Sequence, residues 1–297
     1  MSNSNNKNFF AVFGLLFGAF CWGIIWYPYR LMDAAGVSGV ASSFYTYAIT
    51  IAITTIFLGK HWRGAAKLPA SIIWLGLVAG WTNLSYILAI IDGEVMRVML
   101  LFYLSPFWTL ILAHFWLKEK TQLTGYIAIA ASLLGAFIML HDPKFGYLPL
   151  PRNAAEWLAV SAGIGFALTN VIARKSSHLS LTAKSYAIWI GVIIVALCFV
   201  PIAQSSIPSP TVFTLIDWGV MILIAILLIA ATFLVQYGVA RVEATRASVL
   251  FLFELVVAAI ASYYLAHETM ELKEWIGGGL IVVAAIFAGI HHQDSAN

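Results

Sequence analysis

Ionisable side chains are rare within the apolar stretches of this sequence, and Glu254 is the one carboxylate that stands well inside such a stretch. A carboxyl group in apolar surroundings has to be protonated, paired or in contact with water. Two chemical roles follow from this. Glu254 can exchange a proton, or it can hold the ammonium group of a ligand. Structural pairing with a neighbouring helix is the alternative, and the sequence leaves it open.

Other polar and aromatic residues inside apolar stretches could line a binding cavity. Trp22 and Trp26 are four residues apart, so on a helix they share one face with Gly18. A wall of rings beside a small residue can stack on a flat ligand. Ordinary core packing of the rings, and helix–helix bonding by the polar groups, are the alternatives. Our candidates for the cavity are Trp22, Trp26, Trp81, Asn83, Tyr86, Tyr103, Asn170, Gln236, Tyr237 and Glu254.

The pattern Glu-x-x-Arg occurs at Glu94–Arg97 and again at Glu243–Arg246. One helical turn places each Glu beside its Arg. The pairs can be anchors whose long side chains reach the membrane surface. They can also be elements of two gates, in which case Arg97 meets a substrate carboxylate. Pro106 leaves the carbonyl of a preceding turn without its helical partner, so a kink or hinge is expected there.

The composition of the chain requires a lipid environment for these residues. Of 297 residues, 62% are apolar and 10% are charged, and the mean hydropathy is +0.91. The apolar stretches are each about 18–22 residues long, enough to cross a hydrocarbon core of ~30 Å. We predict an all-α integral membrane protein with ten transmembrane helices, over residues 9–29, 38–58, 70–90, 95–116, 122–140, 154–173, 183–203, 216–238, 246–266 and 274–290.

Lys and Arg are distributed unevenly between alternate connections of these helices. One set of connections carries 11 of the 16 and the other set carries five. Cytoplasmic loops hold the excess of Lys and Arg, so we expect both termini to lie in the cytoplasm. The expected location is the plasma membrane, which in bacteria is the inner membrane. The net charge of +3 is spread over short connections without a basic stripe, so nucleic acid is not an expected partner.

The two halves of the sequence resemble each other. A shift of 149 positions superimposes the two Glu-x-x-Arg patterns and places Glu119 on Glu268, and near the start of each half residues 22–30 align with residues 166–174. Five helices per half is an odd number, so the second half enters the membrane from the opposite side. We therefore predict two inverted five-helix repeats, residues 1–145 and 150–297, within one compact domain.

These motifs give the chain a family resemblance. It resembles the ten-helix EamA-type members of the drug/metabolite transporter superfamily, in which a proline and a later glutamate mark the end of each repeat. The first copy here reads SPFWTLILAHFWLKEKTQLTG, with Pro106 and Glu119. The second copy reads ELVVAAIASYYLAHETMELKEWIGGG, in which Leu255 replaces the proline and Glu268 remains.

The resemblance covers nearly the whole chain and implies a secondary transporter that works by alternating access. Overall likeness is greatest to YddG-type exporters of aromatic amino acids, which makes export of such an amino acid the expected function. Export of other amino acids, drugs or metabolites is the alternative. The expected partners are a small-molecule substrate and the lipid bilayer.

Other classes of function find less support in the sequence. No nucleotide-binding loop and no cluster of catalytic residues or metal ligands is present, so we expect no enzyme activity, cofactor, metal or nucleotide. An intramembrane enzyme or a non-transporting scaffold are the alternatives. Small residues at four-residue spacing in 122–140 and 274–290 suit close helix packing or a homodimer contact.

Overall fold

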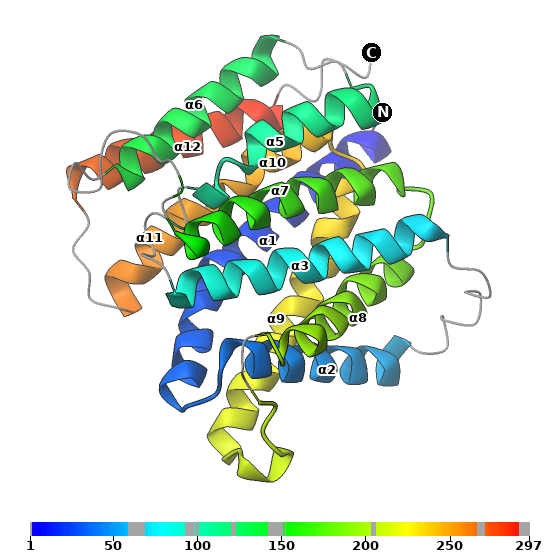
Figure 1. Ribbon diagram of the computed structural model, residues 1–297. Helices are drawn as coiled ribbons and strands as arrows, with labels where there is room; N and C mark the ends of the chain where they lie inside the picture. Colours follow the sequence, from blue (N-terminus) through cyan, green and yellow to red (C-terminus); the bar gives the residue numbers. More distant parts are fainter. Residues whose placement is uncertain are drawn as a thin grey trace.

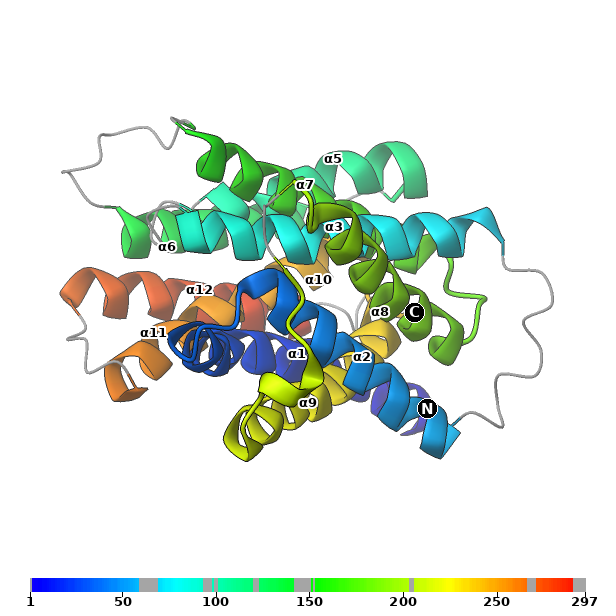
Figure 2. The same ribbon diagram turned by 60° about the horizontal axis from the view of Figure 1, so that its bottom comes forward.

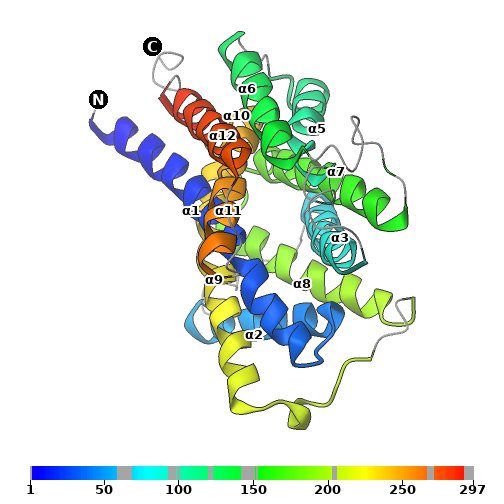
Figure 3. The same cartoon turned by 90° about the vertical axis from the view of Figure 1, so that its left-hand side faces the viewer.

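The computed structural model describes residues 2–58, 69–92, 98, 101–119, 123–141, 151, 153–202, 206–265 and 271–290. Every regular element within these ranges is a helix, and Figure 1 shows the helices packed into one bundle. The start of α1 and the end of α12 lie on the same side of the bundle (Figures 1 and 3). The chain therefore returns to the side from which it starts.

The helices divide between the two halves of the sequence. The first half contains α1 (Ser2–Ala34), α2 (Gly39–Leu58), α3 (Ala70–Asp92), α5 (Ser105–Leu112), a π-helical turn η2 (Ala113–Leu117) and α6 (Leu123–Leu140). The second half contains α7 (Ala154–Lys175), α8 (Leu181–Phe199), a 3-10 turn η4 (Pro210–Val212), α9 (Leu215–Val239), α10 (Ala244–Phe251), α11 (Phe253–Leu265) and α12 (Leu272–Ile290). α1 begins before the predicted residue 9, since no proline or glycine interrupts the polar residues ahead of it.

Seven helical segments in the described ranges are long and apolar enough to cross a membrane. They correspond to the predicted spans one to three and six to nine, with α10 and α11 forming one of them together. The fifth and tenth predicted spans contain shorter apolar helices, Leu123–Ile138 and Trp275–Ala284. Side chains such as Leu215 and Ile56 are 91% and 79% exposed, so lipid has to solvate them. The chain is a multi-pass membrane protein.

The central helices form two layers. Figures 2 and 3 show α3, α5 and α7 on one side, the first layer, and α1, α9, α10 and α11 on the other, the second layer. Each layer mixes the halves: α7 packs along α3 and α5, and α1 packs along α9, α10 and α11. The first helix of each half thus packs on the third and fourth helices of the other half.

Glycines allow the closest helix contacts. A Cβ on Gly191 of α8 would lie 1.9 Å from the carbonyl oxygen of Gly76 in α3, and one on Gly135 of α6 would lie 2.7 Å from the carbonyl oxygen of Gly277 in α12. The small residues of the fifth and tenth predicted spans therefore serve a contact within the chain. α6 and α12 run side by side along one edge of the bundle (Figure 1).

We expect Gly191→Ala to destabilise the protein, because its methyl group would overlap the backbone of α3 and force the two helices apart. Overpacking of this kind costs about 1–3 kcal/mol. The measurement is the thermal unfolding midpoint of the purified protein in detergent. Gly279→Ala is the matched control, since a Cβ there meets nothing within 4 Å. Equal midpoints for the two variants would contradict the proposed contact.

Candidate functional site

The fourth helix of each half is interrupted at the same place in the repeat. In the first half, helix stops at Phe102 and α5 starts at Ser105; in the second half, α10 ends at Phe251 and α11 starts at Phe253. The shift of 149 positions places Leu252 on Tyr103, so the two breaks coincide. Broken helices inside a membrane bundle put free backbone groups at mid-depth, where transporters bind their substrates.

Pro106 lies just after the first break, in the first turn of α5. A proline is tolerated there because that turn needs no helical N–H. The second copy breaks with Leu255 at the equivalent position, so a proline is not required for the interruption. The role of Pro106 as a hinge stays a prediction.

Four aromatic rings meet between the two layers, and we call Trp22, Phe102, Phe166 and Phe251 the four-ring cluster. The ring of Trp22 lies 5.8 Å from that of Phe166 and 5.5 Å from that of Phe251. Phe166 lies 5.6 Å from Phe102 and 5.1 Å from Phe251. All four distances suit favourable ring pairs.

The four-ring cluster follows the internal repeat. The alignment of the halves pairs Trp22 with Phe166 and Phe102 with Phe251. The contact of Trp22 with Phe251 in the second layer is therefore repeated by the contact of Phe166 with Phe102 in the first layer. Trp22 belongs to this packed centre. The three phenylalanines were not among the predicted cavity residues, although the alignment already contained the two pairs.

Three candidate residues gather beside the four-ring cluster, and we call Tyr86, Tyr103 and Glu254 the carboxyl site. The ring of Tyr86 lies 4.8 Å from that of Phe102 at a tilt of 54°, and the ring of Tyr103 lies 5.4 Å from that of Phe102. Glu254, in the first turn of α11, lies close enough to both tyrosines to interact electrostatically with them. It belongs to the second layer and the tyrosines to the first, so the site spans the interface.

The carboxyl site is buried and its hydrogen bonding is incomplete. Glu254 is 8% exposed and Tyr103 is 3% exposed. The hydroxyl of Tyr103 makes no hydrogen bond of acceptable geometry within the described ranges, although Glu254 is near. α1 approaches this point closely, because a Cβ on Gly23 would lie 2.8 Å from the carbonyl oxygen of Glu254. A buried polar group without full partners is suited to an incoming ligand or water.

Further buried polar atoms lack hydrogen-bond partners on the helices around the cluster. They are Nε1 of Trp26 on α1, Nδ2 of Asn170 on α7 and Oε1 of Gln236 on α9, each assessed within the part of the chain that the structure describes. Leaving such groups unpaired costs free energy. Trp26 and Asn170 occupy equivalent positions in the two halves. These three candidates therefore have hydrogen-bonding capacity available to a ligand.

Three other candidates take part in helix packing. Asn83 donates to the hydroxyl of Tyr47 and accepts from that of Ser43, both at 3.3 Å, which ties α3 to α2. The Trp81 ring packs 5.6 Å from Phe199 of α8. Near the end of α9, the guanidinium carbon of Arg241 lies 3.6 Å from the centre of the Tyr237 ring. The structure does not join Asn83, Trp81 or Tyr237 to the carboxyl site.

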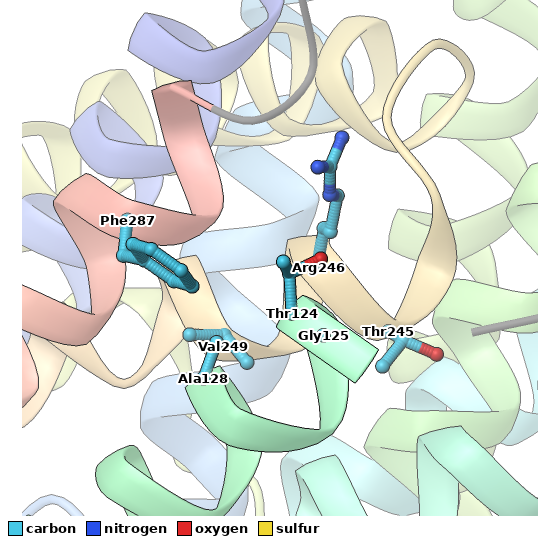
Figure 4. Close-up of a pocket in the computed structure, with 7 residues that line it drawn as sticks. All are labelled: Thr124, Gly125, Ala128, Thr245, Arg246, Val249 and Phe287. Carbon is cyan, nitrogen blue, oxygen red and sulfur yellow. The ribbon is translucent and has the colours of Figure 1, made fainter. Parts of the chain in front are cut away.

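Of the two Glu-x-x-Arg pairs, Glu94 and Arg97 lie outside the described residues. Glu243 and Arg246 adopt the expected one-turn arrangement, with Nε of Arg246 3.8 Å from a carboxylate oxygen of Glu243. The Arg246 side chain is only 8% exposed, so it packs inside the bundle near the start of α10. The roles of the two pairs as anchors or gates stay predictions. It borders a small pocket between α6, α10 and α12, shown in Figure 4, whose other lining residues are Thr124, Gly125, Ala128, Thr245, Val249 and Phe287.

Comparison with known protein families gives one match in each half of the chain. The family model of the EamA-like transporter family matches residues 9–141 and again residues 153–290. The chain belongs to the EamA-like transporter family. It is therefore a transporter and not an enzyme, as the sequence predicts. The double match also agrees with two sequence repeats.

Several relatives are similar along most of their length. An S-adenosylmethionine uptake transporter of Rickettsia bellii is 26% identical over 267 residues, which cover 85% of this chain and 83% of the relative. Its namesake in Rickettsia prowazekii is 24% identical over 82% of this chain and 79% of the relative. An uncharacterized transporter of Archaeoglobus fulgidus is 23% identical over 76% of this chain and 78% of the relative. These names do not support the narrower likeness to YddG-type exporters.

One solved crystal structure shares the fold. It superimposes with a TM-score of 0.71 over 97% of both chains, at 16% sequence identity. At this identity the likeness concerns the arrangement of the helices alone.

We expect Phe166→Ala to lower stability by about 3–5 kcal/mol, because the ring contacts three others between the layers. The measurement is the thermal unfolding midpoint in detergent. Phe10→Ala is the control, since Phe10 is 58% exposed on α1. If both variants unfold at the same temperature, the four-ring cluster does not hold the layers together.

Proposed function

We propose that this EamA-like transporter moves a small amphipathic metabolite by alternating access, and that Glu254 binds the ammonium group of the substrate. The observation that carries this proposal is the carboxyl site, where Glu254 faces two tyrosines across the interface of the layers beside four aromatic rings. A carboxylate in such surroundings attracts a cation, and the rings offer a face to a flat group.

The arrangement of the halves supports alternating access. We propose that residues 1–145 and 150–297 are inverted repeats, because each has five predicted helices and the same helix is broken in each. Equivalent helices also make equivalent contacts with the other half. Two similar halves of opposite orientation can exchange conformations, which opens a central site first to one side and then to the other.

The excess of Lys and Arg in one set of connections supports cytoplasmic termini in a bacterial inner membrane. With that orientation, the ends of η2, α7 and α9 and the start of α10 lie at the cytoplasmic face. The homodimer stays a prediction that no contact within the chain supports.

The proposed substrate carries an α-amino group and a flat ring. Aromatic amino acids have both, and their export is the first candidate. S-adenosylmethionine, which the names of the Rickettsia relatives give as their substrate, also combines an α-amino group with an aromatic base. Uptake of such a compound is the second candidate. Both candidates use the same two recognition elements, a carboxylate and a set of rings.

Counterflow into liposomes tests the substrate class. Purified protein is reconstituted, loaded with unlabelled compound, and assayed with labelled tryptophan, phenylalanine, S-adenosylmethionine and alanine. We expect accumulation of at least one ring-bearing compound and little accumulation of alanine. Indole-3-propionate, which lacks the amino group of tryptophan, should compete poorly. Exchange of alanine at the rate of the ring-bearing compounds would contradict the proposed specificity.

We expect Glu254→Gln to reduce counterflow by at least tenfold without unfolding the protein, because the amide cannot neutralise an ammonium group. A hydrogen bond to a charged group contributes about 1.5–3 kcal/mol, which corresponds to that loss. Glu271→Gln is the matched control, since Glu271 pairs with Lys273 at 3.1 Å and is exposed. Full transport by a folded Glu254→Gln variant would remove Glu254 from the binding site.

A further inference from the structure

A second set of charges joins the two layers at the end of the bundle where α7 and α9 finish. Glu119 follows the π-helical turn η2, which directly continues α5 of the first layer. Arg174 lies in the last turn of α7, also in the first layer. Nε of Arg174 lies 3.3 Å from one carboxylate oxygen of Glu119, and the side chains are 25% and 19% exposed. This pair is therefore partly shielded from solvent.

Each member of the pair also bonds to the second layer. The other carboxylate oxygen of Glu119 accepts from the backbone N–H of Ala244, the first residue of α10, at 3.1 Å. The guanidinium of Arg174 donates through Nη1 to the carbonyl oxygen of Ala240, which caps the end of α9. The short turn between α9 and α10 thus receives an anion at one helix start and a cation at one helix end.

These contacts match the electrostatics of helix ends. The start of a helix presents unpaired N–H groups and a partial positive charge, whereas its end presents unpaired carbonyl groups and a partial negative charge. Glu119 accepts from one free N–H group at the start of α10, and Arg174 donates to one free carbonyl group at the end of α9. The ion pair between them holds both side chains in place. Since the turn between α9 and α10 cannot reverse its polarity, the two charges are not interchangeable.

We propose that the Glu119–Arg174 pair is the closing contact of this end of the transporter, and that it recognises the turn between α9 and α10 by the polarity of its helix ends. This inference rests on the proposed alternating access. For the central site to open toward this end, the layers have to separate here, and both bonds to the second layer have to break. The pair therefore favours the conformation in which this end is shut.

The corresponding cation of the first half is in a different setting. Arg30 aligns with Arg174, and its guanidinium lies 5.0 Å above the ring of Trp26, with the residue exposed. Among the described contacts it joins no helix end of another layer. Glu268, which aligns with Glu119, lies outside the described residues.

The test measures access to the interior from the Arg174 end. Asn170 lies one turn before Arg174 on the same face of α7 and is 3% exposed, so Asn170→Cys reports opening just beneath the pair. The reporter is introduced into a Cys21→Ala, Cys198→Ala background. Inside-out and right-side-out vesicles are treated with a membrane-impermeant maleimide, and the rate of labelling is compared. No substrate is needed, so this test can fail while transport is upheld.

We expect Glu119→Gln to raise the labelling rate of the reporter about tenfold in one vesicle orientation, and Arg174→Gln to do the same. The exposed ion-pair variant Glu271→Gln should leave the rate unchanged. The double variant Glu119→Arg, Arg174→Glu should not restore the wild-type rate, because it places each charge at a helix end of the same sign. This last result separates recognition of helix ends from a simple ion pair.

Two results overturn the proposal. One is a labelling rate for both folded Gln variants that equals that of the parent protein, and the other is restoration of the parent rate by the double variant. Folding is checked by size-exclusion chromatography in detergent. If Glu119→Gln does not fold, Arg174→Gln carries the same comparison.

Discussion

A membrane interior contains no water to pair with free backbone groups, and this constraint governs the whole structure. Helices satisfy it within themselves, so an interruption is tolerated only where protein surrounds it. The two breaks, at Tyr103–Leu104 and at Leu252, fall at the interface of the layers, next to the four-ring cluster. Both breaks are thus confined to the interior of the protein, beside the rings and Glu254.

The site and the closing contact occupy different levels of the same interface. At mid-bundle the layers meet through rings and a carboxyl group; at the Arg174 end they meet through charges and helix ends. A contact between rings is the sum of many weak atom pairs, so a small rotation removes only part of it. Hydrogen bonds to a carboxylate depend strongly on distance and angle. Separating the layers therefore affects the charged end first and the aromatic centre least.

Much of this architecture could be predicted from the sequence. Apolar stretches gave the helices, and the repeated Glu-x-x-Arg and Glu119 with Glu268 gave the two halves. Glu254 was found because a carboxylate in an apolar stretch is conspicuous. The alignment could not show that Trp22, Phe102, Phe166 and Phe251 touch, since a repeat carries no information about helix rotation. For the same reason the sequence could not show that Asn83 and Trp81 lie on other helix faces than the residues of the carboxyl site.

Two features had no local signal at all. The break at Leu252 contains no proline or glycine, so propensity does not mark it. The partners of Glu119 lie 55 and 125 positions further along the chain, and one of them is a backbone N–H, which every residue except proline has. Motif recognition can identify Glu119 as unusual, but only the packing of the layers reveals what it binds.

The four-ring cluster can act as a pivot, a fulcrum, about which the two layers rotate. Layers that are joined by rings at mid-depth can tilt about that point, whereas sliding would separate Phe166 from both Trp22 and Phe251. A hydrocarbon core of ~30 Å puts each helix end roughly 15 Å from the fulcrum, so a tilt of roughly 10° displaces it by about 3 Å. That lever arm is long enough to detach a carboxylate from a helix start while the rings at the pivot stay packed.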